Sequence, residues 1–180
     1  PAVDSRRQQL AEAAGRQIVS TIEQDLRPSK ILTQDAFENA IRTLHAIGGS
    51  TNAIIHLTAI AGRVGVELPL DLFDSLSRTT PFILDLKPSG RFLMEDFFYA
   101  GGLRALMKQI EDRLDLSALT ITGKTLGENL EGAVVYNDDV IRPLSNPVYQ
   151  EGSLAVLRGN LCPDGAVIKP AARDPKFHFH

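Results

Sequence analysis

The feature of this chain that most constrains its fold is a change of pattern near Gly132. Before that point, apolar residues repeat at helical spacing over long stretches, which is typical of amphipathic helices. After it this spacing disappears, and prolines separate short apolar runs. Two of these runs, 154–157 and 166–168, predict strands that are joined through residues 160–165. The sequence therefore predicts a helix-rich part followed by a strand-rich part, with a boundary near 140–152.

The helix-rich part opens with three predicted helices, at about 5–23, 33–47 and 51–64. Apolar residues lie on most sides of the third helix, and we therefore expect this helix to be buried. Hydroxyl side chains stand where N-caps are expected. These residues are Ser5 (in a capping box with Gln8), Thr33, and Ser50 or Thr51.

Shorter segments follow, and their signals are weaker. The pattern predicts helices at 70–76, 92–99 and 103–114, a short helix with a Thr125–Glu128 capping box, and strands at 82–86 and 120–122. Pro88, Ser89 and Gly90 are turn residues that would end the strand at 82–86.

Composition places the chain among globular proteins with no broad attraction for nucleic acid or membranes. Of its 180 residues, 43% are apolar and 23% are charged, and the net charge is −3, which is the balance of a soluble domain. A nucleic-acid partner would call for a basic surface. No apolar run reaches the roughly 18–20 residues of a membrane-spanning helix. We therefore expect a cytoplasmic protein that binds neither nucleic acid nor membrane.

The single cysteine and the two ends of the chain carry further expectations. With Cys162 alone, no internal disulfide can form and no multi-cysteine zinc site exists, so we interpret it as an inert packing residue. The chain begins at Pro1 without an initiator methionine and ends in the Phe and His residues of 177–180, a pattern that usually continues into a strand. We interpret both ends as cuts within a longer protein. The alternative is a small natural protein with an unusual tail.

The strongest candidate site is the sequence Gly48-Gly49-Ser50-Thr51-Asn52, which opens the third helix. A helix N-terminus presents unpaired N–H groups and the positive end of the helix dipole. The glycines would let a ligand approach the backbone, and the hydroxyls add donors, so this end could hold a carboxylate or a phosphate. The spacing matches neither a Walker A loop nor a dinucleotide fingerprint. The alternative is a tight turn between helices with an ordinary hydroxyl cap.

His56 lies one turn beyond Asn52 on the same face of the third helix. It could donate to a substrate oxygen or transfer a proton. The alternative is a histidine that is satisfied within the core.

The remaining polar residues favour structural roles. Glu95 and Asp96 suit a helix start, with metal binding as the alternative. Asp138-Asp139 fits a solvated turn. His178 and His180 are two histidines without a third ligand. Because no nucleophile, base and orienting residue come together, we assign no catalytic residue and no metal ligand.

Six stretches, in order, resemble the dehydratase family that includes dihydroxy-acid dehydratase, phosphogluconate dehydratase and the pentonate dehydratases. They cover most of the chain between about 33 and 172: 46–53 with His56-Leu57, 88–90, 94–97 with 100–102, 122–125 with 127–129, 140–143, and 157–161 with 163–169. One such match would be unspecific, whereas six in order are specific. Residues 92–99 and 158–164 are most similar to the arabinonate- or xylonate-type branch.

The resemblance implies an intact enzyme that removes water from a 2,3-dihydroxy acid or an aldonic acid to give a 2-keto acid. It implies an iron–sulfur cluster as Lewis acid on the departing C3 hydroxyl, a magnesium ion that holds the carboxylate, and a serine base. These roles are chemically sensible, because a C2 proton is weakly acidic until the enolate charge is stabilised. The resemblance also implies a homo-oligomer.

This sequence departs from the family pattern in its chemistry-bearing residues. The resemblance places the cluster cysteines and the magnesium ligands before residue 1 and the serine base after residue 180, and Cys162 matches none of them. The expected fold is α/β, with the latter half of a helix-rich catalytic α/β domain (1–148) and the opening strands of a β-barrel-like second domain (149–180). The residues expected to contact substrate are Gly49, Ser50, Thr51, Asn52 and His56.

The resulting prediction is a hydro-lyase fragment that is inactive alone and ligates neither the cluster nor magnesium. A fragment of this kind should expose apolar surface and associate with itself or with the absent parts. Its strands 154–157 and 166–168 should be unpaired or paired with another chain. The alternative is a stand-alone anion-binding or regulatory module that closes its own sheet. A third possibility is a structural subunit completed by a separate chain that carries the cysteines.

Overall fold

The computed structural model describes residues 4–170. Its helices are α1 (Arg6–Glu23), α2 (Pro28–Ile31), α3 (Gln34–Ile47), α4 (Asn52–Arg63), α5 (Leu70–Thr79), α6 (Met94–Tyr99), α7 (Gly102–Gln109), a 3-10 turn (Glu111–Arg113) and α8 (Leu126–Leu130). The strands are β1 (Ala155–Gly159) and β2 (Cys162–Ile168). The described chain therefore combines helices with a two-stranded sheet, which agrees with the predicted α/β class.

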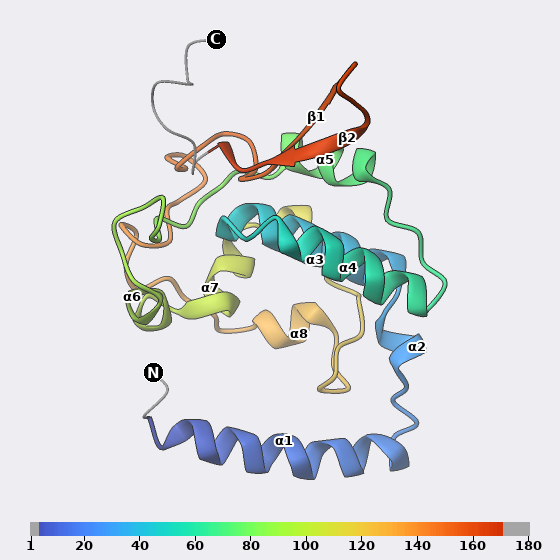
Figure 1. Ribbon diagram of the computed structural model, residues 1–180. Helices are drawn as coiled ribbons and strands as arrows, with labels where there is room; N and C mark the ends of the chain where they lie inside the picture. Colours follow the sequence, from blue (N-terminus) through green and yellow to red (C-terminus); the bar gives the residue numbers. More distant parts are fainter. Residues whose placement is uncertain (1–3, 171–180) are drawn as a thin grey trace.

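The elements are arranged around α3. Figure 1 shows α3 beside α4 in the middle of the molecule, with α5 and the two strands on one side and α7 and α8 on the other. Helix α1 runs separately along the edge beyond α8 and is joined to the body through α2. None of the helices among residues 4–170 is both long enough and apolar enough to cross a membrane.

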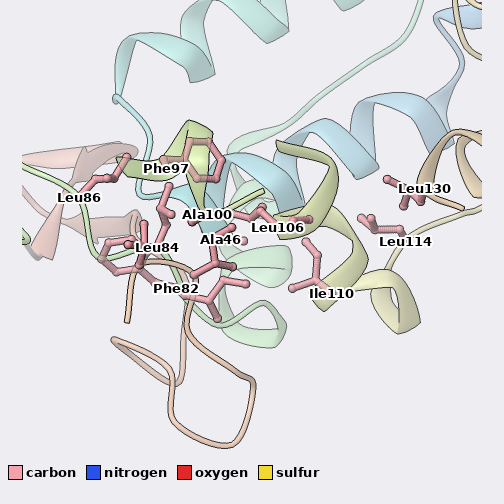
Figure 2. Packing of buried hydrophobic residues seen from close by; sticks show 14 of the residues in the cluster. Ala46, Phe82, Leu84, Leu86, Phe97, Ala100, Leu106, Ile110, Leu114 and Leu130 are labelled. Carbon is pink, nitrogen blue, oxygen red and sulfur yellow. The ribbon is translucent and has the colours of Figure 1, made fainter. Parts of the chain in front are cut away.

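Two clusters of buried apolar side chains form the core. The first surrounds the extended segment 82–86 and includes Phe82, Leu84, Leu106 and Ile110, which Figure 2 shows packed together. The second joins α3, α4 and α5 through residues such as Ile41, Ile54 and Phe73. Leu154, just before β1, belongs to the second cluster, so the strand-rich part is anchored on the helical part.

Local capping signals predicted two of the helix starts correctly. The Thr33 side chain accepts the N–H of Ala36 at 3.3 Å and caps α3. At α8, the Thr125 hydroxyl accepts the N–H of Glu128, and the Glu128 carboxylate accepts the N–H of Thr125. Both hydroxyl residues have the extended backbone that a side-chain cap requires.

The capping box expected at Ser5 is wrong. Ser5 has a helical backbone and makes no side-chain cap bond, because a residue in that conformation does not turn its hydroxyl toward the next N–H groups. The Asp4 carboxylate instead accepts the N–H of Arg6 at 2.9 Å. The helix itself is present and ends at Glu23, as its composition predicted.

Two predicted strands have a different form. Segment 82–86 is extended and buried, but it makes only single bridges, to Tyr149, Ile141 and Phe92 in turn. Because its neighbours are three different segments, no continuous ladder forms. Residues 120–122 are a turn and not a strand, since the N–H of Gly123 bonds to the carbonyl of Thr120 at 3.0 Å.

The expected burial of α4 is also wrong. Only Ile54 and Ala61 of this helix are buried, whereas Ile55 is 68% exposed and Ile60 is 45% exposed. Among the described residues, α4 packs mainly against α3 along one side. Ala53 and Leu57 are partly buried against the core, whereas Ile55 and Ile60 are exposed, although the composition is that of a buried helix.

The two strands pair with each other in an antiparallel ribbon, from Ala155 opposite Ile168 to Gly159 opposite Cys162. The expectation that these strands would be unpaired or held by another chain is therefore wrong. The turn lies at Asn160 and Leu161, which is shorter than the predicted connection, so Cys162 belongs to β2. Cys162 is exposed and is not the packing residue that we expected.

Candidate functional site

The glycine pair between α3 and α4 is required by packing within the chain. Gly48 ends α3 with a φ of 74°, a conformation that favours glycine. A Cβ on Gly48 would lie 2.5 Å from a ring carbon of Phe82, and a Cβ on Gly49 would lie 2.1 Å from Cδ1 of Leu44. Both glycines therefore allow the chain to turn tightly over the core after α3. This agrees with the alternative interpretation of the motif as a tight turn between two helices.

The start of α4 already uses several of its donors locally. The N–H of Asn52 bonds to Oγ of Ser50 at 3.2 Å, the N–H of Ala53 to the carbonyl of Ser50 at 3.0 Å, and the N–H of Ile54 to the carbonyl of Thr51 at 3.2 Å. Ser50 therefore acts as the hydroxyl cap, whereas Thr51 makes no side-chain cap bond. A ligand at this end would be met chiefly by the side chains of Ser50, Thr51 and Asn52.

His56 is exposed on the first turns of α4, on the same face as Asn52. The alternative of a core histidine therefore does not hold for this residue. The structure thus leaves Ser50, Asn52 and His56 open to solvent along one helix end, with Thr51 and Gly49 half-buried beside them.

Lys169 brings a positive charge to this turn. Its Nζ donates to the carbonyl of Gly48 at 2.5 Å, and burial lowers the pKa of its ammonium group. The contact places a cation on the C-terminal end of α3, where the helix dipole favours it. Lys169 follows β2, so the bond also ties the strand-rich part to the turn before α4. Sequence reasoning missed this residue, because nothing local links position 169 to position 48.

The buried histidine of the chain is His45 and not His56. His45 lies on the inner face of α3, and its Nε2 is 3.0 Å from the carbonyl of Phe73, so this nitrogen carries the proton. Burial lowers the pKa of His45 to about 4, more than the Phe73 bond raises it. The segment before β1 also packs on this ring, since a Cβ on Gly152 would lie 2.8 Å from it. The helical spacing from Ile41 could have predicted this burial.

A second buried polar centre is Asp85, which is 7% exposed. Its carboxylate accepts the backbone N–H and the Nε of Arg91, each at 2.8 Å, and Nη2 of Arg142 at 3.2 Å. Burial raises the pKa of Asp85, but these hydrogen bonds outweigh it and hold the pKa below its usual value. Asp85 therefore links Arg91, which follows the stretch 88–90, to Arg142 of the stretch 140–143.

The described residues do not fit a metal cluster. Among residues 4–170, no three His, Cys, Asp or Glu side chains gather closely enough to hold a metal ion. Asp96 has a structural role, since its carboxylate accepts the N–H of Leu93 at 2.7 Å and so supports the start of α6. Asp138 and Asp139 are exposed, as expected for a solvated turn. His178 and His180 lie outside the described residues.

Comparisons with known proteins cover the whole chain. Residues 1–129 match the family described as dihydroxy-acid/6-phosphogluconate dehydratase N-terminal, and residues 139–180 match its C-terminal counterpart. The chain is 51% identical to an L-arabinonate dehydratase of Rhizobium leguminosarum and 52% identical to an L-arabonate dehydratase of Azospirillum brasilense, with all of this chain and 31% of each relative covered. A dihydroxy-acid dehydratase of Caldicellulosiruptor bescii is 48% identical, with 33% of its length covered. The chain thus spans about a third of the length of these relatives.

Proposed function

Because the chain belongs to the dihydroxy-acid/6-phosphogluconate dehydratase family, we propose that it is part of a hydro-lyase acting on a 2,3-dihydroxy acid or an aldonic acid. The observation that carries this proposal is the alignment of the entire chain, at about half identity, with relatives named for such reactions. The arabinonate-type relatives favour a sugar acid as the substrate.

The proposed reaction removes the C2 proton and the C3 hydroxyl group of the acid as water. The resulting enol then becomes the 2-keto acid by moving its proton to C3. Negative charge develops beside the carboxylate as the C2 proton leaves, so the reaction needs positive groups around that end of the substrate. The iron–sulfur cluster and magnesium ion that the resemblance implies have no ligand set among residues 4–170.

Within this chain, we propose that the start of α4 contacts the substrate through Gly49, Ser50, Thr51, Asn52 and His56. The exposed Asn52 and His56 lie on one face and could bond to hydroxyl or carboxylate oxygens. The helix dipole and the nearby ammonium group of Lys169 make this end positive. Since packing accounts for both glycines, the side chains carry most of this proposal.

We further propose two domains, with the boundary at 148 and with 149–180 opening a β-barrel-like domain. The two separate family matches, residues 1–129 and 139–180, support a division into two domains, with the second match beginning before the proposed boundary. We also propose a cytoplasmic enzyme that assembles as a homo-oligomer and binds neither nucleic acid nor membrane. The net charge of −3 supports the exclusion of nucleic acid.

Formation of a 2-keto acid from L-arabinonate tests the proposed function. The chain is assayed alone, and then coexpressed with the parts of the Rhizobium relative that lie outside the aligned stretch, with iron and magnesium supplied. We expect no product from the chain alone and product from the combination. Product from the chain alone would refute the fragment proposal, and no product from a stable combination would refute the hydro-lyase proposal.

One observation favours the alternative of a stand-alone anion-binding module: β1 and β2 pair with each other within the chain. Titration calorimetry of the isolated chain with L-arabinonate separates the two proposals. A module should bind the anion in the millimolar range or tighter and lose this affinity in the Asn52→Ala variant. A fragment should bind it weakly or not at all.

A further inference from the structure

Helix α1 exposes apolar side chains on two of its sides. Ile18 and Leu10 lie toward the body, whereas Val19 and Ile22 point elsewhere, and all four are more than half exposed. Within the described chain, Thr21 is the only buried residue of α1. A lone helix of this length is marginally stable in water, because most helices gain their stability from packing.

The C-terminal end of α1 has local polar contacts, and its N-terminal end contacts the body. At its C-terminal end, the carboxylate of Asp25 pairs with Arg27 and with Lys30 at 2.8 Å, and the N–H of Leu26 bonds to the carbonyl of Thr21 at 2.9 Å. At its N-terminal end, the guanidinium group of Arg6 lies 5.1 Å from the centre of the Phe98 ring. The Arg6–Phe98 contact reaches the body, and Figure 1 shows α1 lying along the edge of the molecule.

An apolar groove lies between α1 and the body of the molecule. One hollow of about 350 Å³ is bordered by α1 and Ile121, and a second of about 440 Å³ is bordered by α3, α7 and the segment 118–121. Ile121 lines both hollows, so they adjoin each other. We define the α1 groove by three residues of α1 and three of the body: Leu10, Ala14, Ile18, Ala40, Leu103 and Ile121.

We propose that the α1 groove is the docking site for an apolar segment from the two thirds of the family's polypeptide that this chain does not span. This inference rests on the proposed function. The lining is mostly apolar, with Gln17, Asn39 and three threonines (Thr21, Thr43 and Thr120) among it, so we expect its occupant to present mainly aliphatic or aromatic side chains. The relatives are about three times as long as the aligned stretch, and the N-terminal family match includes α1 itself. The groove would thus be filled by another part of the domain that contains α1.

The test uses the tagged chain coexpressed with the parts of the Rhizobium relative outside the aligned stretch. We expect these polypeptides to be retained on the tagged chain. Ile18→Asp should reduce retention at least about tenfold, because docking would bury an unpaired carboxylate. Tyr136→Asp is the matched control, since Tyr136 is 75% exposed and lines neither hollow. Ile121→Asp, on the opposite wall, should act like Ile18→Asp and shows that the effect does not depend on the stability of α1.

Three outcomes would overturn the inference: no retention, equal retention by Ile18→Asp and Tyr136→Asp, or a dimer of the chain that Ile18→Asp abolishes and that the added polypeptides do not displace. The last outcome would assign the groove to a second copy. Measuring 2-keto acid in the same eluates separates this inference from the proposed function. Retention without product would support the groove as a docking site and refute the proposed function. Product that is insensitive to Ile18→Asp would support the proposed function and refute the docking site.

Discussion

Helices α1 and α3 have similar sequence signals but different surroundings. Both begin near a hydroxyl residue and carry apolar residues at helical spacing. Helix α3 buries Phe37, Ile41, Leu44 and His45 between its neighbours, whereas α1 buries Thr21 alone among the described residues. The apolar periodicity of a helix therefore indicates that one face is suited to packing. It does not indicate whether the segment that packs on this face lies within the same chain.

Helix α4 is intermediate between these two. It packs on α3 through Ile54 and Ala61 but leaves Ile55 and Ile60 exposed. Its composition is that of a fully buried helix. Both α1 and α4 thus expose apolar residues that are not packed within the described chain.

The largest expected contrast between α3 and α1 is in core packing. Ile41 is fully buried, and Ile41→Ala should lower the free energy of unfolding by about 2–5 kcal/mol through lost burial and a cavity. Ile22 is 80% exposed, and Ile22→Ala should change it by less than about 0.5 kcal/mol. Urea unfolding of both variants measures the difference. Equal losses would show that α1 is packed in solution.

Protonation of the buried His45 of α3 should lower the free energy of unfolding by about 3 kcal/mol. The pKa of His45 falls from 6.5 to about 4 on folding, so the unfolded chain binds more protons between these values. Its contribution to stability is present above pH 6.5 and is lost as the pH falls toward 4, by about 3 kcal/mol in total. His45→Gln should flatten this slope in urea unfolding measured across this pH range. An unchanged slope in His45→Gln would contradict the burial of this ring.

Sequence reasoning predicted the local features well. The ends of α3, the capping box of α8 and the approximate positions of both strands follow from residues that are close together in the chain. These features depend on short-range hydrogen bonds and on periodicity. The sequence therefore contained the information for them within a few positions.

The features that sequence reasoning did not predict depend on contacts between residues that are distant in the chain. The bond from Lys169 to Gly48 spans 121 positions, and that from Arg142 to Asp85 spans 57. The motif also gave no indication that Gly48 packs closely on Phe82, which is 34 positions away in the chain. The start of α4 could be named as a candidate site, but its positive neighbour and its internal hydrogen bonds could not.

A glycine substitution should act in opposite directions on the two helices. Gly48→Ala places a Cβ against Phe82 at a positive φ and should cost about 2 kcal/mol of stability. Gly15 lies inside α1 with nothing within 4 Å of the added Cβ, so Gly15→Ala should stabilise by about 0.5–1 kcal/mol. Thermal unfolding followed by circular dichroism reports both signs. A loss of stability in Gly15→Ala would indicate that a close neighbour covers α1.

The smallest contrast concerns the two predicted caps. Thr33→Ala removes the side-chain bond to the N–H of Ala36 and should lower stability by about 1 kcal/mol. Ser5→Ala should have almost no effect, because the Ser5 hydroxyl makes no cap bond and Asp4 accepts the N–H of Arg6 instead.

Asp4→Ala is the control for this pair, since it removes the acceptor that α1 actually uses. It should destabilise α1 more than Ser5→Ala does, and amide hydrogen exchange at the first turn of α1 resolves this local effect. Faster exchange in Ser5→Ala than in Asp4→Ala would restore the capping box that the sequence suggested. Because α1 is so little buried, the change should stay within that helix and leave the exchange of α3 unaltered.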